Sequence, residues 1–583
     1  MAQRTIEAES VGEAYLALLA DRGIDYLFGN SGTDFPSIIE AFAKAGGDKT
    51  KAPIPVTVPH ENLAVAMAHG YYAVTGRPQA VMFHVNVGTA NGITGVLNAA
   101  RDNVPILFTA GRTPINETDA QGARSVFIHW GQEMFDQAGM LREAVKWDYE
   151  LRTPQQLETV VDRALGLAMT EPRGPVYLSL PREVLADAPG HFSFEDGAGR
   201  RGAATAPAPD PAAIENAAAL LAGAENPLIV TANVGRDPGA FADFATLAER
   251  YALPVVSYRP RCLCLASDHP MHVGYEPAPF LKDADVILVL DCDVPWIPSL
   301  HAVNPAAKVI LMGADPLFAQ YPIRGFPADL AITGASPLAL PAMIEAMAGH
   351  QKAAADRISS RRRRVSKLRA AQGEQLAAAR AAAAESTPMS APWLAHCVDR
   401  AKGAEDIVVS EAQLPIAHMS FTEHGTYQAT PPAGGLGWGL GAALGVKLGA
   451  PDRTVISVVG DGAYMFGGPT PAHYVSASMD LPLLTVILNN HMWGSVRKAT
   501  LGLYPDGAAA KSNRAPLTYF DPVPEYHRVV EASGGYGEKV ETPAELPAAL
   551  DRAMAVVNGE GRQAVLNVVT SYADSQALAD ARR

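Results

Sequence analysis

The chain has 583 residues, of which 48% are hydrophobic and 19% charged, and its formal net charge at pH 7 is −14. This length accommodates three or four average domains, and the apolar content excludes an intrinsically disordered chain. The acidic balance argues against a nucleic-acid partner. Of the four cysteines, Cys262 and Cys264 lie too close together for ordinary zinc-ligand spacing, so a reduced, cytoplasmic setting is expected.

The first 185 residues begin with an acidic amphipathic stretch that lacks the apolar core of a secretion signal. Helical patterns then alternate with short apolar runs, which predict strands at 26–29, 54–58, 80–85, 105–111 and 175–181. Such alternation predicts a parallel sheet covered by helices. We therefore assign residues 1–185 to a first α/β domain.

The rest of the chain divides by composition. Residues 186–210 are rich in Pro, Gly and Ala and read as a linker, and 211–350 resume the strand–helix rhythm of a second α/β domain. Residues 351–387 predict a connecting helix, and 388–583 form a third α/β domain. The four arginines at 361–364 are expected on a solvated helix face, and no window has the apolar length that a membrane span needs.

The third domain contains the most informative stretch. Two runs rich in Val and Ile end at Gly460-Asp461-Gly462 and at Asn489-Asn490, as buried parallel strands would end at one sheet edge. A carboxylate and an amide oxygen there suit Mg²⁺ shared with a diphosphate. A tight turn and a helix cap are the plainer alternatives for each motif alone, but their joint occurrence favours the cation site.

This pair of motifs resembles the thiamine diphosphate (ThDP) motif of the 2-oxoacid decarboxylase and acetolactate synthase superfamily. The resemblance implies three doubly wound parallel-sheet domains: a pyrimidine-binding domain, a middle domain and a diphosphate-binding domain. It also implies ThDP and Mg²⁺ as cofactors. It assigns Mg²⁺ to Asp461, Asn490 and the Met492 carbonyl. The implied cofactor contacts of this domain are Leu436, Gly460, Asp461, Gly462, Ala463, Asn490 and Met492.

Two of the implied cofactor contacts have plainer alternatives. Glu61 follows a strand pattern and begins a helix in a PHEN context that resembles the family's glutamate, which protonates the cofactor's ring; otherwise it only favours the helix dipole. Leu436, among glycines, resembles the residue that props ThDP in its bent form. Its alternative is a glycine-rich helix packing interface.

Three positions resemble benzoylformate decarboxylases in particular. Thr33, in FGNSGT, stands where that group presents a hydroxyl to the substrate carboxylate. His84 resembles its first active-site histidine, and His301 falls near the second, so both are candidates for proton transfer. A hydrogen-bonded structural histidine is the alternative for His84, and the two readings of His301 are balanced.

Other positions depart from that group. Where it has leucines and aromatic residues around a phenyl ring, this chain has Gly131-Gln132 and Lys498-Ala499. His129, Gln132 and Lys498 therefore predict a pocket for a polar or anionic substrate tail, unless they are solvated surface. Phenylglyoxylate is accordingly not expected as the native substrate.

The resulting hypothesis is a ThDP- and Mg²⁺-dependent decarboxylation of a 2-oxoacid to an aldehyde, with possible carboligation. The resemblance implies a homodimer or homotetramer, with Glu61 of one subunit facing the diphosphate site of another. The nearest alternative is an acetolactate synthase-like carboligase or a C–C lyase, which Gln132 favours and His84 and Thr33 disfavour. A nucleotide-dependent oxidoreductase would need a GxGxxG motif that the sequence lacks, and a non-catalytic cofactor-binding protein is a third possibility. The substrate side chain, and whether FAD or ADP binds the central domain, stay open.

Overall fold

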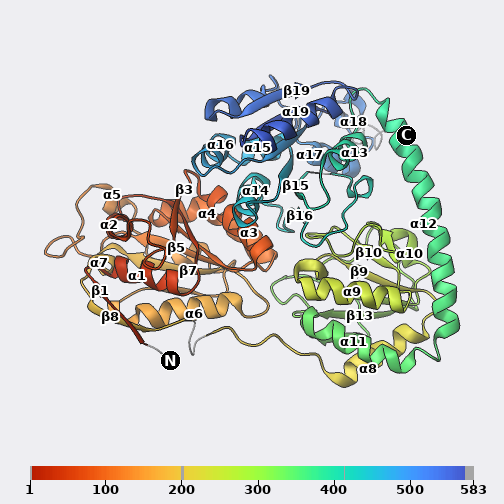
Figure 1. Ribbon diagram of the computed structural model, residues 1–583, viewed down its shortest axis with the longest axis horizontal. Coiled ribbons are helices and arrows are strands. Elements are labelled where there is room, and N and C mark those ends of the chain that lie inside the picture. Colours follow the sequence, from red (N-terminus) through yellow and green to blue (C-terminus); the bar gives the residue numbers. More distant parts are fainter. Residues whose placement is uncertain (1–2, 198–201, 413, 571–583) are drawn as a thin grey trace.

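The computed structural model describes residues 3–197, 202–412 and 414–570. Figure 1 shows three lobes, with the first domain in red and orange at the left, the central domain in yellow and green at the right, and the third in blue at the top. Each is built on a six-stranded parallel sheet. The predicted fold class, α/β with three doubly wound parallel-sheet domains, is confirmed.

The first sheet has the order β3-β2-β4-β5-β7-β6. Strands β4 and β7 are buried along their whole length, because helices cover both faces of a parallel sheet. The strands are β2 (Tyr26–Asn30), β3 (Ile54–Thr57), β4 (Gln79–Phe83), β5 (Ile106–Arg112), β6 (Asp148–Glu150) and β7 (Val176–Pro181). The helices are α1 (Val11–Asp21), α2 (Pro36–Ala45), α3 (Glu61–Thr75), α4 (Val85–Arg101), α5 (Ile128–Gly131), α6 (Leu157–Met169) and α7 (Arg182–Ala186).

Two further strands extend the first domain beyond the predicted boundary at residue 185. Strand β1 (Gln3–Ala8) pairs antiparallel with β8 (Gly190–Glu195), so the predicted linker 186–210 begins with structured chain. Phe192 and Phe194 alternate inward in β8 and are buried against the domain core. This period-two pattern was hidden by the Gly, Pro and Ala content of the segment.

The central sheet has the order β11-β10-β9-β12-β13-β14, which reverses direction between β9 and β12 as doubly wound sheets do. Its strands are β9 (Pro227–Thr231), β10 (Val255–Ser257), β11 (His272–Gly274), β12 (Val286–Leu290), β13 (Lys308–Gly313) and β14 (Leu330–Thr333). Its helices are α8 (Pro211–Gly223), α9 (Pro238–Arg250), α10 (Ala278–Leu281) and α11 (Ser336–His350).

The predicted connecting helix is α12 (Ala355–Ala384), which runs along the right edge of the molecule from the central to the third domain (Figure 1). The expectation of a fully solvated arginine run is wrong for Arg361. Its buried guanidinium donates to the carbonyls of Leu221 and Ala222 at 2.9 and 3.3 Å, near the end of α8, where helix carbonyls lack partners. No helix in the described ranges is both long and apolar enough to cross a membrane.

The third sheet has the order β16-β15-β17-β18-β20-β19. When the six strands of each sheet are numbered in chain order, the third sheet has the same strand order as the first. The strands are β15 (Ile407–Glu411), β16 (Tyr427–Ala429), β17 (Val455–Gly460), β18 (Leu484–Asn489), β19 (Tyr536–Val540) and β20 (Ala564–Val569). The helices are α13 (Ala391–Ala401), α14 (Trp438–Gly449), α15 (Asp461–Phe466), α16 (Pro469–Ser478), α17 (Gly494–Leu503), α18 (Ala508–Ser512) and α19 (Leu546–Gly559).

The first and third domains meet along α3 and α14, which lie side by side at the centre of the molecule (Figure 1). A Cβ atom on Gly445 of α14 would lie 2.0 Å from the carbonyl oxygen of Met67 in α3, and one on Gly441 would lie 2.6 Å from the Cβ of Ala66. Glycine is required where two backbones approach so closely. The packing interpretation of the glycine-rich segment therefore holds for these two glycines.

Candidate active site

Glu61 is the first residue of α3, at the edge of the first sheet where it faces the third domain. Its side chain is buried, and its two carboxylate oxygens accept from Asn30 Nδ2 at 2.9 Å and from Asn91 Nδ2. In the described ranges, no ion pair involves Glu61. Both oxygens of this buried carboxyl are therefore held by neutral amide donors.

The segment that precedes α14 lies against the start of α3. Asn62 Nδ2 donates to the Leu436 carbonyl at 3.3 Å, and Asn98 and Gly435 exchange two hydrogen bonds, with Nδ2 to oxygen at 2.8 Å and backbone nitrogen to Oδ1 at 3.0 Å. Leu436 is thereby fixed next to the residue that follows Glu61. The structure thus brings together two of the predicted cofactor contacts, Glu61 and Leu436, from domains far apart in the chain.

Glu411, the last residue of β15, fixes the other side of this segment. Its carboxylate accepts from the backbone nitrogens of Gly437 and Gly439 at 2.8 and 2.7 Å. Burial raises the pKa of Glu411 to about 7, and these backbone hydrogen bonds oppose the rise. Sequence reasoning missed Glu411, although a carboxylate at the end of an apolar strand is the same signal that singled out Asp461.

Asp461 and Asn490 follow the neighbouring strands β17 and β18, as predicted. The backbone N–H of Met492 lies between their side chains, 3.2 Å from Asp461 Oδ2 and 3.1 Å from Asn490 Oδ1. The second carboxylate oxygen of Asp461 accepts from Gly462 N at 2.9 Å. The Met492 carbonyl accepts from Gly494 N at 2.9 Å, which leaves one lone pair for a metal.

This donor set fits a hard divalent cation held jointly with a phosphate. Asp461 is 2% exposed, and burial raises its pKa to about 7, as expected for a carboxylate buried without a counter-charge. One carboxylate, one amide oxygen and one carbonyl are too few to complete an Mg²⁺ shell alone, which suits shared ligation. Among the described residues, no group of three or more His, Cys, Asp or Glu side chains is arranged so that it could hold a metal ion.

The predicted substrate residues of the first domain form one cluster. His84, directly after β4, donates from Nδ1 to Asp34 Oδ1 at 2.5 Å, and its Nε2 lies 3.1 Å from the Gln132 side-chain amide. His129 Nε2 lies 3.4 Å from the Thr33 hydroxyl, and its Nδ1 accepts from a backbone N–H. Thr33, His84, His129 and Gln132 are thus brought together, as the sequence predicted.

His129 lies in a positively charged setting. Burial, together with nearby Arg182 and Arg124, lowers the pKa of His129 below its usual value. Because its Nδ1 accepts the Ser125 N–H at 3.2 Å, the neutral ring carries its proton on Nε2 and donates toward Thr33. The cluster therefore presents fixed donors to any anionic group that enters it.

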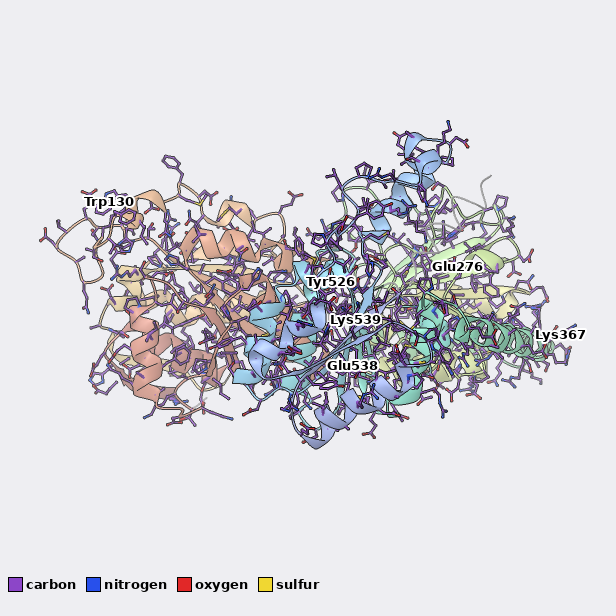
Figure 2. The ribbon with its side chains drawn as sticks, turned by 90° about the horizontal axis from the view of Figure 1, so that it is seen from above. Trp130, Glu276, Lys367, Tyr526, Glu538 and Lys539 are labelled. Atoms are coloured by element: carbon purple, nitrogen blue, oxygen red, sulfur yellow. The ribbon has the colours of Figure 1, made fainter. Side chains whose placement is uncertain are left out.

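Two predicted site residues lie outside this cluster. His301 lies in the central domain, where Nε2 is 3.5 Å from Glu276 and Nδ1 accepts from Ile297 N at 3.0 Å. Figure 2 shows Glu276 far along the molecule from Trp130, which adjoins His129. The structure therefore does not bring His301 to His84, because the loop after β12 is turned toward its own domain. Lys498 is exposed on α17, and no described contact joins it to Gln132.

A cavity of about 460 Å³ lies elsewhere, between the first and central domains. Its lining includes Asn233 and Asp291, which follow β9 and β12, where the order of the central sheet reverses. No predicted site residue lines it. It occupies the usual ligand position of a doubly wound sheet, and the question of a nucleotide there stays open.

Fold and site together define a three-domain α/β protein with a buried carboxyl site where its flanking domains meet. Models of three thiamine pyrophosphate enzyme domains match the chain: the N-terminal TPP binding domain at residues 9–140, the central domain at 214–343 and the C-terminal TPP binding domain at 410–568. The chain therefore belongs to the thiamine pyrophosphate enzyme family, whose members include both decarboxylases and acetolactate synthases.

Similar proteins span nearly the whole chain. The acetolactate synthase isozyme 3 large subunit of Escherichia coli K12 is 25% identical over 566 residues, which cover 94% of this chain and 93% of that protein. The benzoylformate decarboxylase of Pseudomonas aeruginosa is 28% identical over 516 residues, with 84% and 87% covered. The structure of benzoylformate decarboxylase from Polynucleobacter necessarius superposes with a TM-score of 0.77 at 20% identity, covering 97% and 99%, which supports the fold.

Proposed function

We propose that this enzyme is ThDP- and Mg²⁺-dependent and decarboxylates a 2-oxoacid to an aldehyde without oxidation. One observation carries the proposal: the buried Glu61 carboxyl begins α3, the buried Asp461 and the half-buried Asn490 follow strands of the third domain, and the two domains are joined at Leu436. When bound, ThDP supplies the electron sink that cleavage beside a keto group requires. The net reaction consumes one proton and releases CO₂ and the aldehyde.

Each group of residues then has a defined task. The Glu61 carboxyl exchanges a proton with the cofactor's ring, and Leu436 supports the cofactor between its two ends. The Thr33 hydroxyl binds the substrate carboxylate, and His84 holds the proton that replaces the departing CO₂. Cation and diphosphate are held at the strand ends of the third domain by Gly460, Asp461, Gly462, Ala463, Asn490 and Met492.

The test is a panel of aromatic, aliphatic and acidic 2-oxoacids, scored for CO₂ release with and without ThDP and Mg²⁺. We expect release from at least one substrate, and only with both cofactors present. Because Gln132 and His129 make the pocket polar, polar or acidic 2-oxoacids should react faster than phenylglyoxylate. If no 2-oxoacid releases CO₂ and no ligated product forms, the decarboxylase proposal fails.

A carboligase of the acetolactate synthase kind is the second candidate. The polar Gln132 in the pocket favours it, as does the similarity to acetolactate synthases along 94% of the chain. Incubation with pyruvate separates the two candidates, since a carboligase yields acetolactate and a decarboxylase yields acetaldehyde. His84, held at the pocket as a proton carrier, favours the aldehyde.

The assembly proposed for the enzyme is a homodimer or homotetramer with active sites at the subunit interface. Large apolar side chains beside the pocket, Phe127 and Phe135, are exposed in the single chain, and such exposure is typical of surfaces that another subunit covers. In this single chain, Asn62, the residue after Glu61, contacts Leu436 of the same molecule. Native mass spectrometry will give the number of subunits, and a monomer at micromolar concentration would contradict this assembly.

A cytoplasmic location is proposed as well. All four cysteines are unpaired and buried, as is typical of proteins from a reducing compartment. Cell fractionation with a tagged full-length chain tests it, and recovery in an oxidising compartment would contradict it.

A further inference from the structure

We propose that Asp34 is the positioning residue of His84, which it holds in the tautomer that carries the proton on Nδ1 and leaves Nε2 unprotonated and turned toward the substrate pocket. This inference rests on the proposed function for its chemical meaning. Asp34 is 2% exposed, and each of its carboxylate oxygens has one partner. Oδ1 accepts from His84 Nδ1 at 2.5 Å, and Oδ2 accepts from the backbone nitrogen of Val85 at 3.2 Å.

The backbone around His84 is held in a costly conformation. Val85 has φ of +36°, in the left-handed region that β-branched residues avoid. Such a conformation persists only where the surroundings enforce it, and such residues cluster at functional sites. The Asp34 carboxylate accepts from the ring of His84 and from the backbone N–H of Val85. It therefore fixes the ring and the strained backbone together.

Two glycines leave space for the hydrogen-bonded side chains of Asp34 and His84. A Cβ atom on Gly32 would lie 2.1 Å from His84 Nδ1, and one on Gly111 at the end of β5 would lie 1.7 Å from Asp34 Oδ2. Neither neighbour can move away without breaking the Asp34–His84 hydrogen bond. The positions of the Asp34 and His84 side chains therefore require glycine at residues 32 and 111.

The last residue of β2 and the turn that follows it contact the proposed catalytic groups. Asn30 binds Glu61, Thr33 faces His129, and Asp34 binds His84. With Nδ1–H donated to Asp34, the Nε2 lone pair accepts from the Gln132 amide. Rotation of that amide would present its oxygen to a protonated ring, so Gln132 can serve both charge states of His84.

The proton balance follows from this arrangement. Protonated His84 gives its Nε2 proton to the carbon that loses CO₂, keeps the N–H electron pair on Nε2, and takes a new proton from water. Asp34 stabilises the protonated ring throughout, and it keeps its own negative charge. The other titratable or charged groups around the ring are His129 with Arg124 and Arg182 beyond it, and Glu61 across the first turn of α4.

The experiment compares Asp34→Asn and Gly111→Ala with Gly29→Ala, whose Cβ would meet only ordinary contacts of 3.6 Å or more. The pH profile of kcat is the first measurement. Because Asp34→Asn removes the negative charge beside the ring, the alkaline limb of this variant should move to lower pH. Gly111→Ala should move the alkaline limb in the same direction, and Gly29→Ala should leave the limb where it is in the wild type. The ThDP affinity of all three variants should equal that of the wild type.

A second measurement needs no activity and therefore separates this inference from the proposed function. Histidine-selective ¹⁵N NMR of the wild-type chain, assigned with His84→Gln, should show the Nδ1–H tautomer for His84. An Nε2–H tautomer overturns the inference even if the variants fail to fold. The inference is also overturned if Asp34→Asn and Gly111→Ala lose activity equally at every pH and the alkaline limb of kcat stays in place. A residue with a merely structural role would give that result.

Discussion

A Cβ atom on Gly70 in α3 would lie 2.0 Å from the carbonyl oxygen of Ala442 in α14. The first and third domains are therefore in backbone contact along two helices whose N-terminal ends carry Glu61 and adjoin Leu436. The distance between these two site residues is set by how closely the helices approach.

Gly70→Ala should consequently lower the free energy of unfolding by about 2–3 kcal/mol and weaken ThDP binding, since the helices must separate. Calorimetry of the full chain gives the stability. Gly373→Ala in α12 is the matched control, because its Cβ meets nothing within 4 Å and should stabilise by about 0.5–1 kcal/mol. Equal effects of the two substitutions would refute the close-packing account.

Glu61→Gln should reduce turnover by a factor of about 10² or more while ThDP still binds, because the amide keeps an acceptor for Asn30 but cannot exchange a proton. Steady-state kinetics and calorimetric titration of ThDP measure the two effects. Glu158→Gln, at the far side of the same domain, should leave both unchanged. Wild-type turnover in Glu61→Gln would exclude the assigned role.

Loss of one proposed metal ligand should weaken cofactor binding. Asp461→Asn should weaken Mg²⁺-dependent ThDP binding at least about tenfold, which corresponds to about 1.4 kcal/mol, and EDTA should do the same to the wild type. Asp452→Asn on the exposed surface of the same domain is the control. If Asp461→Asn binds ThDP as tightly as the wild type, the metal does not bind at Asp461.

Gln132→Leu should shift substrate preference toward phenylglyoxylate by about tenfold in relative kcat/KM. The substitution removes the amide that faces His84, together with an oxygen that is buried without a hydrogen-bond partner among the described atoms. Competition between phenylglyoxylate and a dicarboxylic 2-oxoacid measures the shift. Gln121→Leu, exposed in the same segment, should not alter it.

Glu411 should make the cofactor-free protein less stable as pH rises. Its pKa is about 7 in the folded chain and near 4.5 when unfolded, so between these values the folded state retains a proton that the unfolded state has released. The contribution of Glu411 to stability is therefore largest below about pH 4.5, falls through pH 7 and then levels off, by at most about 3 kcal/mol. In Glu411→Gln, the stability difference between pH 5 and pH 8 should shrink by a comparable amount; an unchanged difference would show that Glu411 is ionised in both states.

The residues that sequence reasoning placed correctly share a local signal. Asp461 and Asn490 each end a run of Val and Ile, and Glu61 lies where a strand pattern gives way to a helix pattern. Parallel-sheet geometry then brings strand ends together without further information. The fold class follows from the same periodicity.

The residues that it missed depend on partners distant in the chain. Asp34 contacts His84, Glu411 contacts Gly437, and Arg361 contacts carbonyls near the end of α8. Asp34 in its turn and Arg361 on its helix give no local sign of such a partner, whereas Glu411 ends an apolar strand and so has the signal that singled out Asp461. His301 lies in a loop after β12, where no periodicity fixes the direction of the chain, and the resemblance alone could not place it.

The contacts between α3 and α14 come in reciprocal pairs. Gly70 meets Ala442 as Gly445 meets Met67, each at 2.0 Å, and Ala66 meets Gly441 between them. Two helices related by a local twofold axis would make such reciprocal contacts, and the two domains that carry α3 and α14 have sheets of the same strand order. When the two helices are aligned so that Ala66 corresponds to Gly441, Glu61 corresponds to Leu436. Since the junction has the isologous form of a homodimer interface, exchange of the first domain between two chains would preserve each of these contacts.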